Sequence, residues 1–545
     1  MSTPNLALVL HAHLPYIRHP ERPRFYEESW LFEAITETYL PILRALERLT
    51  ADQVPVRLTM SVTPPLAEML ADALLRDRYA RHLDALAELA ADEVEQRAAT
   101  PFEAATVALA QDLAETRSFH RALGGDVLAA FRRFQELGVL ELITCTATHG
   151  LLPLMATDAS RRAQVAIAAA VHERHFGRRP RGIWLPECAF APGVDGLLAD
   201  EGIGFFFMEK HGLLNATPGA AYGTARPVAT EAGVAAFARD PECSSQIWSA
   251  ESGYPGDPAY REFHRDLGYE LPLDRPHLSE LHSGGARHPI GLKLYRITGK
   301  VPLGEKAPYD PALAIARVQE HARHFVDSRE RQLRALTDAL PSDVPPFLVA
   351  PFDAELFGHW WSEGPRFLEA VFRAAAGSET VRLGTPAEFL EGDPALEVVT
   401  PSACTWGDKG YYEVWLNDEN AWIYPHLHAA ERRLVALVDA HPRAHGAFRR
   451  ALAQLGRELL LAQSSDWAFL VTTSTAGDYP KNRTLAFLRR FEKLASDLER
   501  QTVDLPFLAE CERRDAIFAD LDPSAWASRS VTRPGAGSLT DLSTP

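Results

Sequence analysis

The stretch 348-LVAPFDAELFGHWW-361 changes character at Asp353, where an apolar, strand-like run gives way to a segment rich in aromatic residues. The stretch 182-GIWLPECAF-190 changes in the same way at Glu187. Two carboxyl groups placed at strand ends, near aromatic rings that can hold the faces of a sugar, meet the requirements for cleaving a glycosidic bond. The competing interpretation is that each acid only caps the helix that follows it.

Similar apolar runs recur along the chain, and most are followed by a polar, Pro or Gly break. We expect strands at NLALVL (5–10), VRLTMSV (56–62), LELITCT (140–146), RGIWLP (181–186), IGFFFME (203–209), LKLYRIT (292–298), PFLVAPF (346–352) and VRLG (381–384). Strands that alternate with helical stretches predict a parallel α/β fold, and in barrels of this type the chemistry lies at the carboxyl ends of the strands. Seven or eight strands are expected.

Two stretches interrupt this alternation. Residues 66–138 are rich in Ala, Leu, Glu and Arg with helical periodicity, which predicts a helical insertion. Residues 1–65 and 139–400 would then form the catalytic barrel, and residues 401–527 a helical C-terminal domain that contributes to the cleft. The polar tail at 528–545 is expected to be disordered.

Composition restricts the classes of partner. The 545 residues carry 56 basic and 73 acidic side chains, a formal charge of −17, which disfavours nucleic acid and anionic membranes and favours a neutral ligand. The five cysteines have no CxxC spacing, so neither a disulfide framework nor a zinc knuckle is indicated. With no leader pattern and no run of about 20 apolar residues, we expect a cytoplasmic protein.

Histidines gather at two of the predicted strand ends. His11 and His13 lie on the same side of an extended segment because side chains alternate with period two, and His149 follows another strand. They could hydrogen-bond a substrate or bind a metal. Three histidines at one barrel face are difficult to explain by packing alone.

Aromatic, irregular segments predict a binding cleft. Trp406 and Trp415, within 404–417, could serve as sugar platforms or pack between domains. The polar, turn-rich segment 239–262 reads as a lid, with Trp248, Tyr254 and Arg261 as its contact residues and Tyr254 at its tip. Asp466 either reaches the cleft or holds the C-terminal domain to the barrel. No nucleotide-binding, serine-hydrolase or zincin motif is present.

Five motifs in order give the chain a resemblance to glycoside hydrolase family 57, most closely to its 1,4-α-glucan branching enzymes. They are HAHLPY (11–16), THGLLPL (148–154), GIWLPECAF (182–190), APFDAELFGHWW (350–361) and TWGDKGYYEVWLN (405–417), followed by SSDWAFL (464–470). This resemblance implies an incomplete (β/α)7 barrel with a helical insertion and an all-helical C-terminal domain. It implies no cofactor and no metal.

The resemblance also implies roles for individual residues. Glu187 would be the nucleophile and Asp353 the general acid/base of a retaining reaction, with the two carboxyls roughly 5–5.5 Å apart. The substrate, an α-glucan, would contact a set of side chains in the cleft: His11, His13, His149, Arg261, Gly285, Trp406, Trp415 and Asp466. One departure is Ala354, where the family pattern leads us to expect Thr.

Three alternatives remain open at this point. An α-amylase or 4-α-glucanotransferase of the same family would keep both carboxyls and differ in acceptor. A metal-dependent polysaccharide deacetylase would use His and Asp at strand ends to hold a metal, although Glu187 counts against it. A non-catalytic glucan-binding protein would bind without turnover, which the presence of both carboxyls disfavours.

Overall fold

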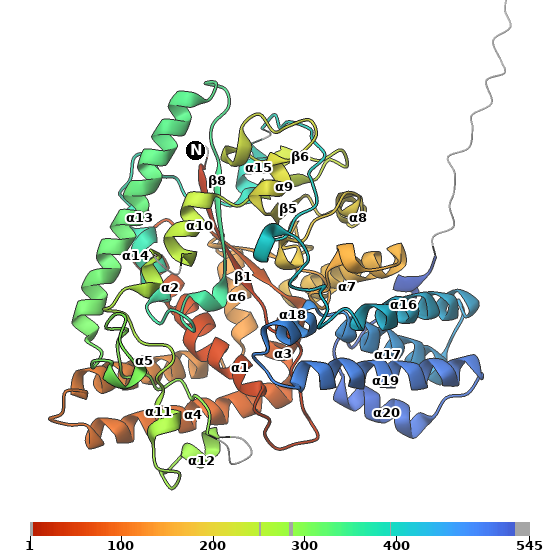
Figure 1. The fold of residues 1–545 in the computed structure, drawn as a ribbon, viewed down its shortest axis with the longest axis horizontal. Helices are drawn as coiled ribbons and strands as arrows, with labels where there is room; N and C mark the ends of the chain where they lie inside the picture. Colours follow the sequence, from red (N-terminus) through yellow and green to blue (C-terminus); the bar gives the residue numbers. More distant parts are fainter. Residues whose placement is uncertain (1–3, 250–251, 283–286, 393, 529–545) are drawn as a thin grey trace, which may run out of the picture.

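The computed structural model describes residues 4–249, 252–282, 287–392 and 394–528 (Figure 1). Gly285 and the tail from residue 529 therefore lie outside the described residues. The described strands are β1 (Leu6–Ala12), β2 (Leu58–Val62), β3 (Leu140–Ile143), β4 (Gly182–Ile183), β5 (Phe205–Met208), β6 (Val228–Ala229), β7 (Ala235–Ala238) and β8 (Leu348–Asp353).

The strands form two sheets that together make an incomplete barrel. Their orders are β3-β2-β1-β8 and β4-β5-β7-β6, and every pairing is parallel except β6 with β7. A parallel bridge between Thr144 and Ile183 joins β3 to β4. On the other side, the N–H of Asp240, just after β7, donates a 2.9 Å hydrogen bond to the carbonyl of Val349 in β8. The predicted fold class, an incomplete barrel of seven parallel strands, is confirmed.

Alternation along the strands separates the barrel interior from the surrounding helices. In β1, Leu6, Leu8 and Leu10 pack in the large core that includes the outer helices, whereas Ala7 and Val9 belong to the cluster inside the barrel. That inner cluster also includes Trp184, and further Phe and Val side chains from β5, β7 and β8. With period two, His11 continues the inward series and reaches the carboxyl-end rim of the barrel.

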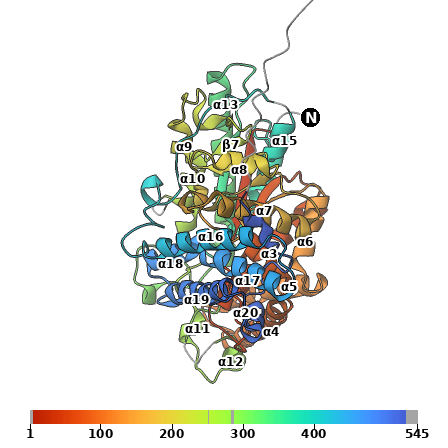
Figure 2. The same ribbon diagram turned by 90° about the vertical axis from the view of Figure 1, so that its right-hand side faces the viewer.

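Helices cover the barrel and extend it on two sides (Figures 1 and 2). The first group is α1 (Glu28–Glu33), a π-helix (Ala34–Tyr39) and α2 (Leu40–Ala51). Within 66–138 lie most of α3 (Pro64–Ala71), then α4 (Ala73–Gln96), α5 (Glu103–Ala122) and α6 (Val127–Glu136); α4 and α5 pack on each other, while α6 packs on β3. Around the barrel follow α7 (Asp158–Phe176), α8 (Val194–Asp200), α9 (Lys210–Leu214), α10 (Pro241–Trp248), α11 (Leu267–Glu270), α12 (Leu278–Leu281), α13 (Pro311–Ala339), α14 (Gly364–Ala376) and α15 (Pro386–Glu391).

The C-terminal part is helical. It contains α16 (Ile423–Ala440), α17 (Gly446–Ala462), α18 (Ser465–Thr473), α19 (Tyr479–Glu499) and α20 (Leu505–Arg514). Helix α17 packs against α16, α19 and α20, and α19 also packs against α16 and α18. None of the helices within the described ranges is long and apolar enough to cross a membrane.

Two predicted strands are absent from the described sheets. The run 292–298 forms only isolated bridges to loop residues, because left-handed backbone at Gly291, Thr298 and Gly299 brackets it. The run 381–384 makes one bridge, between Leu383 and Leu6. The barrel instead contains β7, which was not predicted. Three of its four residues are alanines, and alanine has a low strand propensity.

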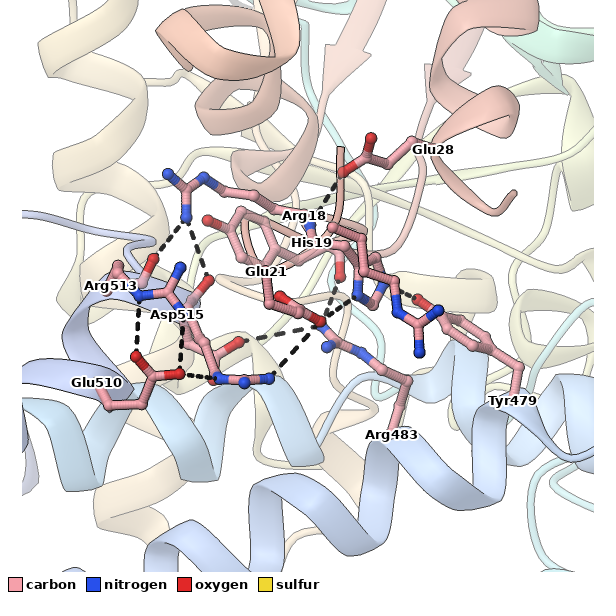
Figure 3. A network of polar contacts seen from close by, with 12 residues as sticks. Arg18, His19, Glu21, Glu28, Tyr479, Arg483, Glu510, Arg513 and Asp515 are labelled. Atoms are coloured by element: carbon pink, nitrogen blue, oxygen red, sulfur yellow. Dashed lines mark hydrogen bonds and ion pairs between the residues drawn. The ribbon is translucent and has the colours of Figure 1, made fainter. Parts of the chain in front are cut away.

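A polar network fastens the N-terminal segment 13–28 to the C-terminal helices (Figure 3). Arg18 donates from Nη1 to the carbonyl of Arg513 at 2.7 Å, and His19 Nε2 lies 2.9 Å from the hydroxyl of Tyr479. Arg483 Nη2 donates to a carbonyl of the same N-terminal segment at 3.2 Å. The segment that leaves β1 is therefore held against α19 and the end of α20.

Candidate active site

Glu187 lies in a short 3-10 turn (Pro186–Cys188) that follows β4 after two intervening residues, and its backbone has an unusual conformation. Its φ is +58°, and Cys188 follows with φ +51°. Left-handed backbone at non-glycine residues costs free energy and is concentrated at functional sites. Two hydrogen bonds hold the turn: Trp406 donates from its backbone N–H to the Glu187 carbonyl at 2.9 Å, and from Nε1 to Oε2 at 2.7 Å.

Asp353 is the last residue of β8 and is paired in register with His11 of β1. Although it precedes a 3-10 turn, its side chain makes no capping hydrogen bond. The side chain of Glu187 likewise goes to Trp406 and not to a helix end. The capping interpretation therefore fails for both acids, and both carboxyls line the same cavity.

The environments of the two carboxyls differ. Burial raises the pKa of Glu187 to about 8; the Trp406 hydrogen bond opposes this rise, and the charge of Asp353 adds to it. Burial also raises the pKa of Asp353 to about 8, and here the neighbouring carboxylate of Glu355 adds to the rise while Arg239 opposes it. Burial therefore dominates at both carboxyls and their pKa values are similar; the Trp406 donor stabilises the ionised form of Glu187, and Arg239 stabilises that of Asp353.

Glu355 is itself held in place by two donors. Its Oε1 accepts from the Tyr39 hydroxyl and, at 3.2 Å, from the backbone N–H of His13. Burial raises its pKa to about 7. Tyr39 belongs to the π-helix, a form that occurs mostly at functional sites, so the π-helix contacts the segment that carries Asp353.

The three predicted histidines meet at the rim of the barrel. His11 Nε2 and His149 Nε2 lie 3.0 Å apart, and the rings of His13 and His149 stack with centroids at 3.7 Å. The other nitrogens of His11 and His149 contact Ser61 at 3.2 Å and Ser465 at 2.8 Å. Burial lowers the pKa of His11 and of His149 well below the usual value, so both rings are neutral and can exchange hydrogen bonds with hydroxyl groups.

Asp466, from α18, reaches this cluster from the C-terminal part of the chain. Its carboxylate lies 3.0 Å from Nε2 of His13, whose Nδ1 lies 3.1 Å from Thr63 Oγ1. Burial alone would raise the pKa of Asp466, but the charge and hydrogen bond of His13 hold it below the usual value. The site is thus assembled from both the barrel and the C-terminal helices.

Among the residues that the structure describes, two groups of side chains offer atoms close enough to share a metal ion: His11 with Cys145 and His149, and His13 with His149 and Asp466. In the second group the two imidazole rings are nearly parallel, with 11° between their planes. A nitrogen lone pair lies in the plane of its ring, so stacked rings direct their lone pairs side by side and not toward one point. This arrangement suits hydroxyl recognition better than metal coordination.

The two carboxyls, Glu355, the three histidines and Asp466 line one cavity of about 1170 Å³. This volume exceeds that of a typical pocket for a single small molecule and suits an extended ligand. The cavity wall contains many aromatic side chains: Tyr26, Trp30, Trp248, Phe263, Tyr269, Trp360, Trp406, Trp415 and Phe469. Of the predicted contacts, His11, His13, His149, Trp248, Trp406, Trp415 and Asp466 lie here together with Glu187 and Asp353.

Other predicted positions need correction. Tyr254 is 7% exposed and its hydroxyl lies 2.8 Å from His324 Nδ1, so the prediction that it forms the tip of a lid is wrong. The start of its segment is the helix α10 and not an open loop. Trp415 is 1% exposed, and its ring packs under Gly407, so it supports the wall and is no open platform.

Arg261 does not line the cavity of the carboxyl pair. It borders a neighbouring cavity of about 460 Å³ between α2, α5, α13 and α14, which shares Gly291 and Lys293 with the main cavity. Its Nη1 donates to the carbonyl of Lys293 at 2.7 Å, and its guanidinium lies over the ring of Tyr309 at 4.3 Å. Arg261 is thus set back from the wall of the main cavity, and its contact with a substrate stays a prediction.

Several cavity residues were not predicted from the sequence. Arg239 follows β7 and forms a 2.6 Å ion pair with Glu209; recognising β7 would have placed it at a strand end. Glu355 lies two residues after Asp353, in a stretch where the aromatic residues gave the stronger pattern. Glu33 lies in a helical region, where nothing in the local pattern separates it from a surface acid.

An incomplete α/β barrel with two buried carboxyls at the ends of its strands, beside neutral histidines and exposed rings, defines an enzyme that acts on glycosidic bonds. Residues 7–267 match the model of glycosyl hydrolase family 57, and residues 426–526 match that of the C-terminal region of 1,4-alpha-glucan branching enzymes. The chain belongs to glycosyl hydrolase family 57, among its branching enzymes.

Curated relatives extend over nearly the whole chain. The 1,4-alpha-glucan branching enzyme TK1436 of Thermococcus kodakarensis is 37% identical over 94% of this chain and 77% of its own length. The probable 1,4-alpha-glucan branching enzyme Rv3031 of Mycobacterium tuberculosis is 33% identical over 94% of this chain and 96% of its own length.

Solved structures agree on the fold. The alpha-amylase AmyC from Thermotoga maritima gives a TM-score of 0.90 at 40% identity, covering 97% of this chain and 100% of its own. The TK1436 structure gives a TM-score of 0.87 at 35% identity, covering 97% of both chains. The two neighbours differ in their named activity, so the acceptor of the reaction is the point to be tested.

Proposed function

We propose that this protein is a 1,4-α-glucan branching enzyme that works by a retaining double displacement through Glu187 and Asp353. The observation that carries the proposal is the composition of the cavity. Both carboxyls lie at barrel strand ends, and the region matched by the branching-enzyme model completes their surroundings with Asp466 and Ser465.

In the first step, the carboxylate of Glu187 attacks the anomeric carbon of an α-1,4 bond while Asp353 protonates the departing oxygen. Trp406 donates to Oε2 of Glu187 and so orients and stabilises the carboxylate needed for attack, and a pKa of about 8 keeps a proton on Asp353 for the departing oxygen. The neutral imidazoles of His11 and His149, with the charged Asp466, would hold the hydroxyls of the glucosyl unit that is cleaved.

In the second step, Asp353, now ionised, removes the proton from a 6-hydroxyl of another glucan segment. The freed oxygen attacks the anomeric carbon, the bond to Glu187 breaks, and an α-1,6 branch forms with the original stereochemistry. Water competes for the same intermediate. Transfer therefore depends on how well the cavity holds an acceptor chain.

A second candidate, hydrolysis of α-1,4 bonds, is favoured by the similarity to AmyC. Amylose incubated with the purified protein separates the two. New α-1,6 signals in the proton NMR spectrum with little gain in reducing ends support branching. Reducing ends that rise without α-1,6 signals contradict branching and support an α-amylase.

We further infer that the enzyme acts in the cytoplasm in glycogen synthesis. All five cysteines are unpaired and buried, which suits a reducing compartment. Deleting the gene should give a stored glucan with longer unbranched chains and a stronger iodine colour. An unchanged chain-length distribution contradicts this role.

A further inference from the structure

One end of the cavity has no part in the chemistry described so far. We call it the Tyr269 end and define it by Tyr26, Glu33, Phe263, Tyr269 and Trp360, all of which line the cavity. Three of its rings are well exposed: Tyr26 at 39%, Tyr269 at 52% and Trp360 at 56%. Open aromatic faces gathered in one concave region indicate a binding surface.

The groups of this end lie close together. The rings of Phe263 and Trp360 stack with centroids 4.6 Å apart. The pKa of Tyr26 is raised by burial and then by the charges of Glu33 and Tyr269, and Glu33 also raises the pKa of Tyr269 after burial and Asp266. Glu33 thus lies near both tyrosines. Burial and the charge of Glu37 raise its own pKa to about 8, so its carboxyl group can both donate hydrogen bonds to ligand hydroxyls and accept them.

The Glu33 carboxylate is left available for such bonds. It lies 3.9 Å from Nδ1 of His359, which is closer, at 2.7 Å, to Glu37. Within the described ranges no hydrogen bond ends on the Glu33 carboxylate, although its side chain is only 13% exposed. A largely buried carboxylate that opens into a cavity without a donor is suited to a ligand hydroxyl.

The surface is held rigidly by its surroundings. The carboxylate of Asp266 accepts backbone hydrogen bonds of 2.8–3.0 Å from Gly268, Ile290 and Gly291, which closes the loop that bears Tyr269. Gly358 has φ +128° and packs so tightly on the Glu37 carbonyl that a Cβ would lie 1.9 Å from its oxygen. The segment from Asp353 to Trp360 is therefore fixed against the π-helix.

The position of this end relative to the carboxyls indicates what it binds. Trp360 follows Asp353 on the same rigid segment, and the acid/base group faces the oxygen that leaves and the oxygen that arrives. The histidines and Asp466 instead surround the site where the glucosyl unit would be cleaved. Chains on the side of Trp360 are therefore the departing segment and, after it leaves, the acceptor.

We propose that the Tyr269 end is the acceptor site and holds a second α-glucan chain with its 6-hydroxyl directed at Asp353. The inference rests on the proposed branching function. Tyr269 and the Phe263–Trp360 pair would support sugar faces, and the Glu33 carboxyl would exchange hydrogen bonds with sugar hydroxyls. As the acceptor O6–C1 bond forms, the C1–Oε bond to Glu187 breaks, and the O6 proton passes to the Asp353 carboxylate.

The test compares the Tyr269→Ala variant with the wild type and measures how the glucosyl-enzyme intermediate divides between transfer and hydrolysis. New α-1,6 bonds and new reducing ends are counted on the same amylose digest. We expect the ratio of branches to reducing ends to fall about tenfold, the factor that corresponds to one lost contact of this kind, while their sum changes by less than about threefold. Glu33→Gln should lower the ratio in the same direction.

The controls separate binding from folding. Tyr269→Phe keeps the ring and should keep the ratio near wild type; Leu273→Ala changes a side chain of the same segment that is 58% exposed and does not line the cavity. Thermal unfolding checks that each variant is folded. If the wild type branches but Tyr269→Ala keeps its ratio, or loses both products equally, the acceptor site is overturned alone. A wild type that makes no α-1,6 bonds overturns the proposed function and the acceptor site together.

Discussion

The indole Nε1 of Trp406 donates a 2.7 Å hydrogen bond to Oε2 of Glu187, and the backbone N–H of the same tryptophan binds the Glu187 carbonyl. One residue from the loop after the barrel therefore fixes both the side chain and the left-handed backbone of the proposed nucleophile. The bond also opposes the effect of burial on the Glu187 pKa.

Replacing Trp406 with Phe should lower kcat/KM by about 10- to 100-fold, because it removes a hydrogen bond to a charged group while keeping a ring. The Glu187 pKa should rise further, which moves the acidic limb of the pH profile to higher pH. Trp248→Phe, whose ring lies 6.5 Å from that of Trp406, should leave this limb in place. An unmoved limb in Trp406→Phe would contradict the assigned interaction.

Glu187→Gln should be more stable than the wild type at pH 8 and equal to it near pH 4. The Glu187 pKa rises from about 4.5 to about 8 on folding, so between these values the native state binds more protons than the unfolded state. The free energy of unfolding therefore falls as pH rises through this window, and Gln removes that loss. We expect a gain on the order of 1–3 kcal/mol at pH 8. Denaturant unfolding at both pH values measures it, with exposed Glu419→Gln as control.

Asp353→Asn should lower activity on amylose by about 10²- to 10⁴-fold, since the departing sugar oxygen needs a proton. The loss should be much smaller for the first step on an aryl maltooligoside, whose phenolate departs without protonation. A burst of phenolate followed by slow turnover is the expected time course. Equal losses on both substrates would show that Asp353 is not the acid.

Asp466→Asn should lower kcat/KM by about 10- to 100-fold, because the 3.0 Å contact with His13 loses its charge and the imidazole loses its orientation. Asp478→Asn provides a matched control, an exposed aspartate of the same C-terminal part that does not line the cavity. Similar kinetics for the two variants would argue that the C-terminal helices support the barrel without entering the reaction.

Much of this site could be predicted because its residues follow strands. Glu187, Asp353 and His11 come directly after or within apolar runs, and the geometry of a parallel barrel brings such positions to one rim. Arg239 occupies an equivalent position but was missed, because the alanines of β7 give a weak strand pattern.

Positions far from strand ends could not be predicted in this way. Tyr254 and Arg261 lie in a long segment whose path is set by packing on α13 and α14; that packing buries Tyr254 against His324 and places Arg261 in the neighbouring cavity. Glu33 becomes part of the cavity only because the chain continues into a π-helix that contacts the Asp353 segment. Such relationships depend on tertiary contacts that no local pattern contains.

The central claim is that Glu187 forms a covalent bond to the glucan. The most direct measurement is mass spectrometry of protease-digested Asp353→Asn protein after brief reaction with an aryl maltooligoside. The predicted result is a peptide containing Glu187 that is heavier by whole glucosyl units, and that is absent when Glu187 is also replaced by Gln. A burst of phenolate without any such peptide, or with the glucan on another residue, would contradict the account.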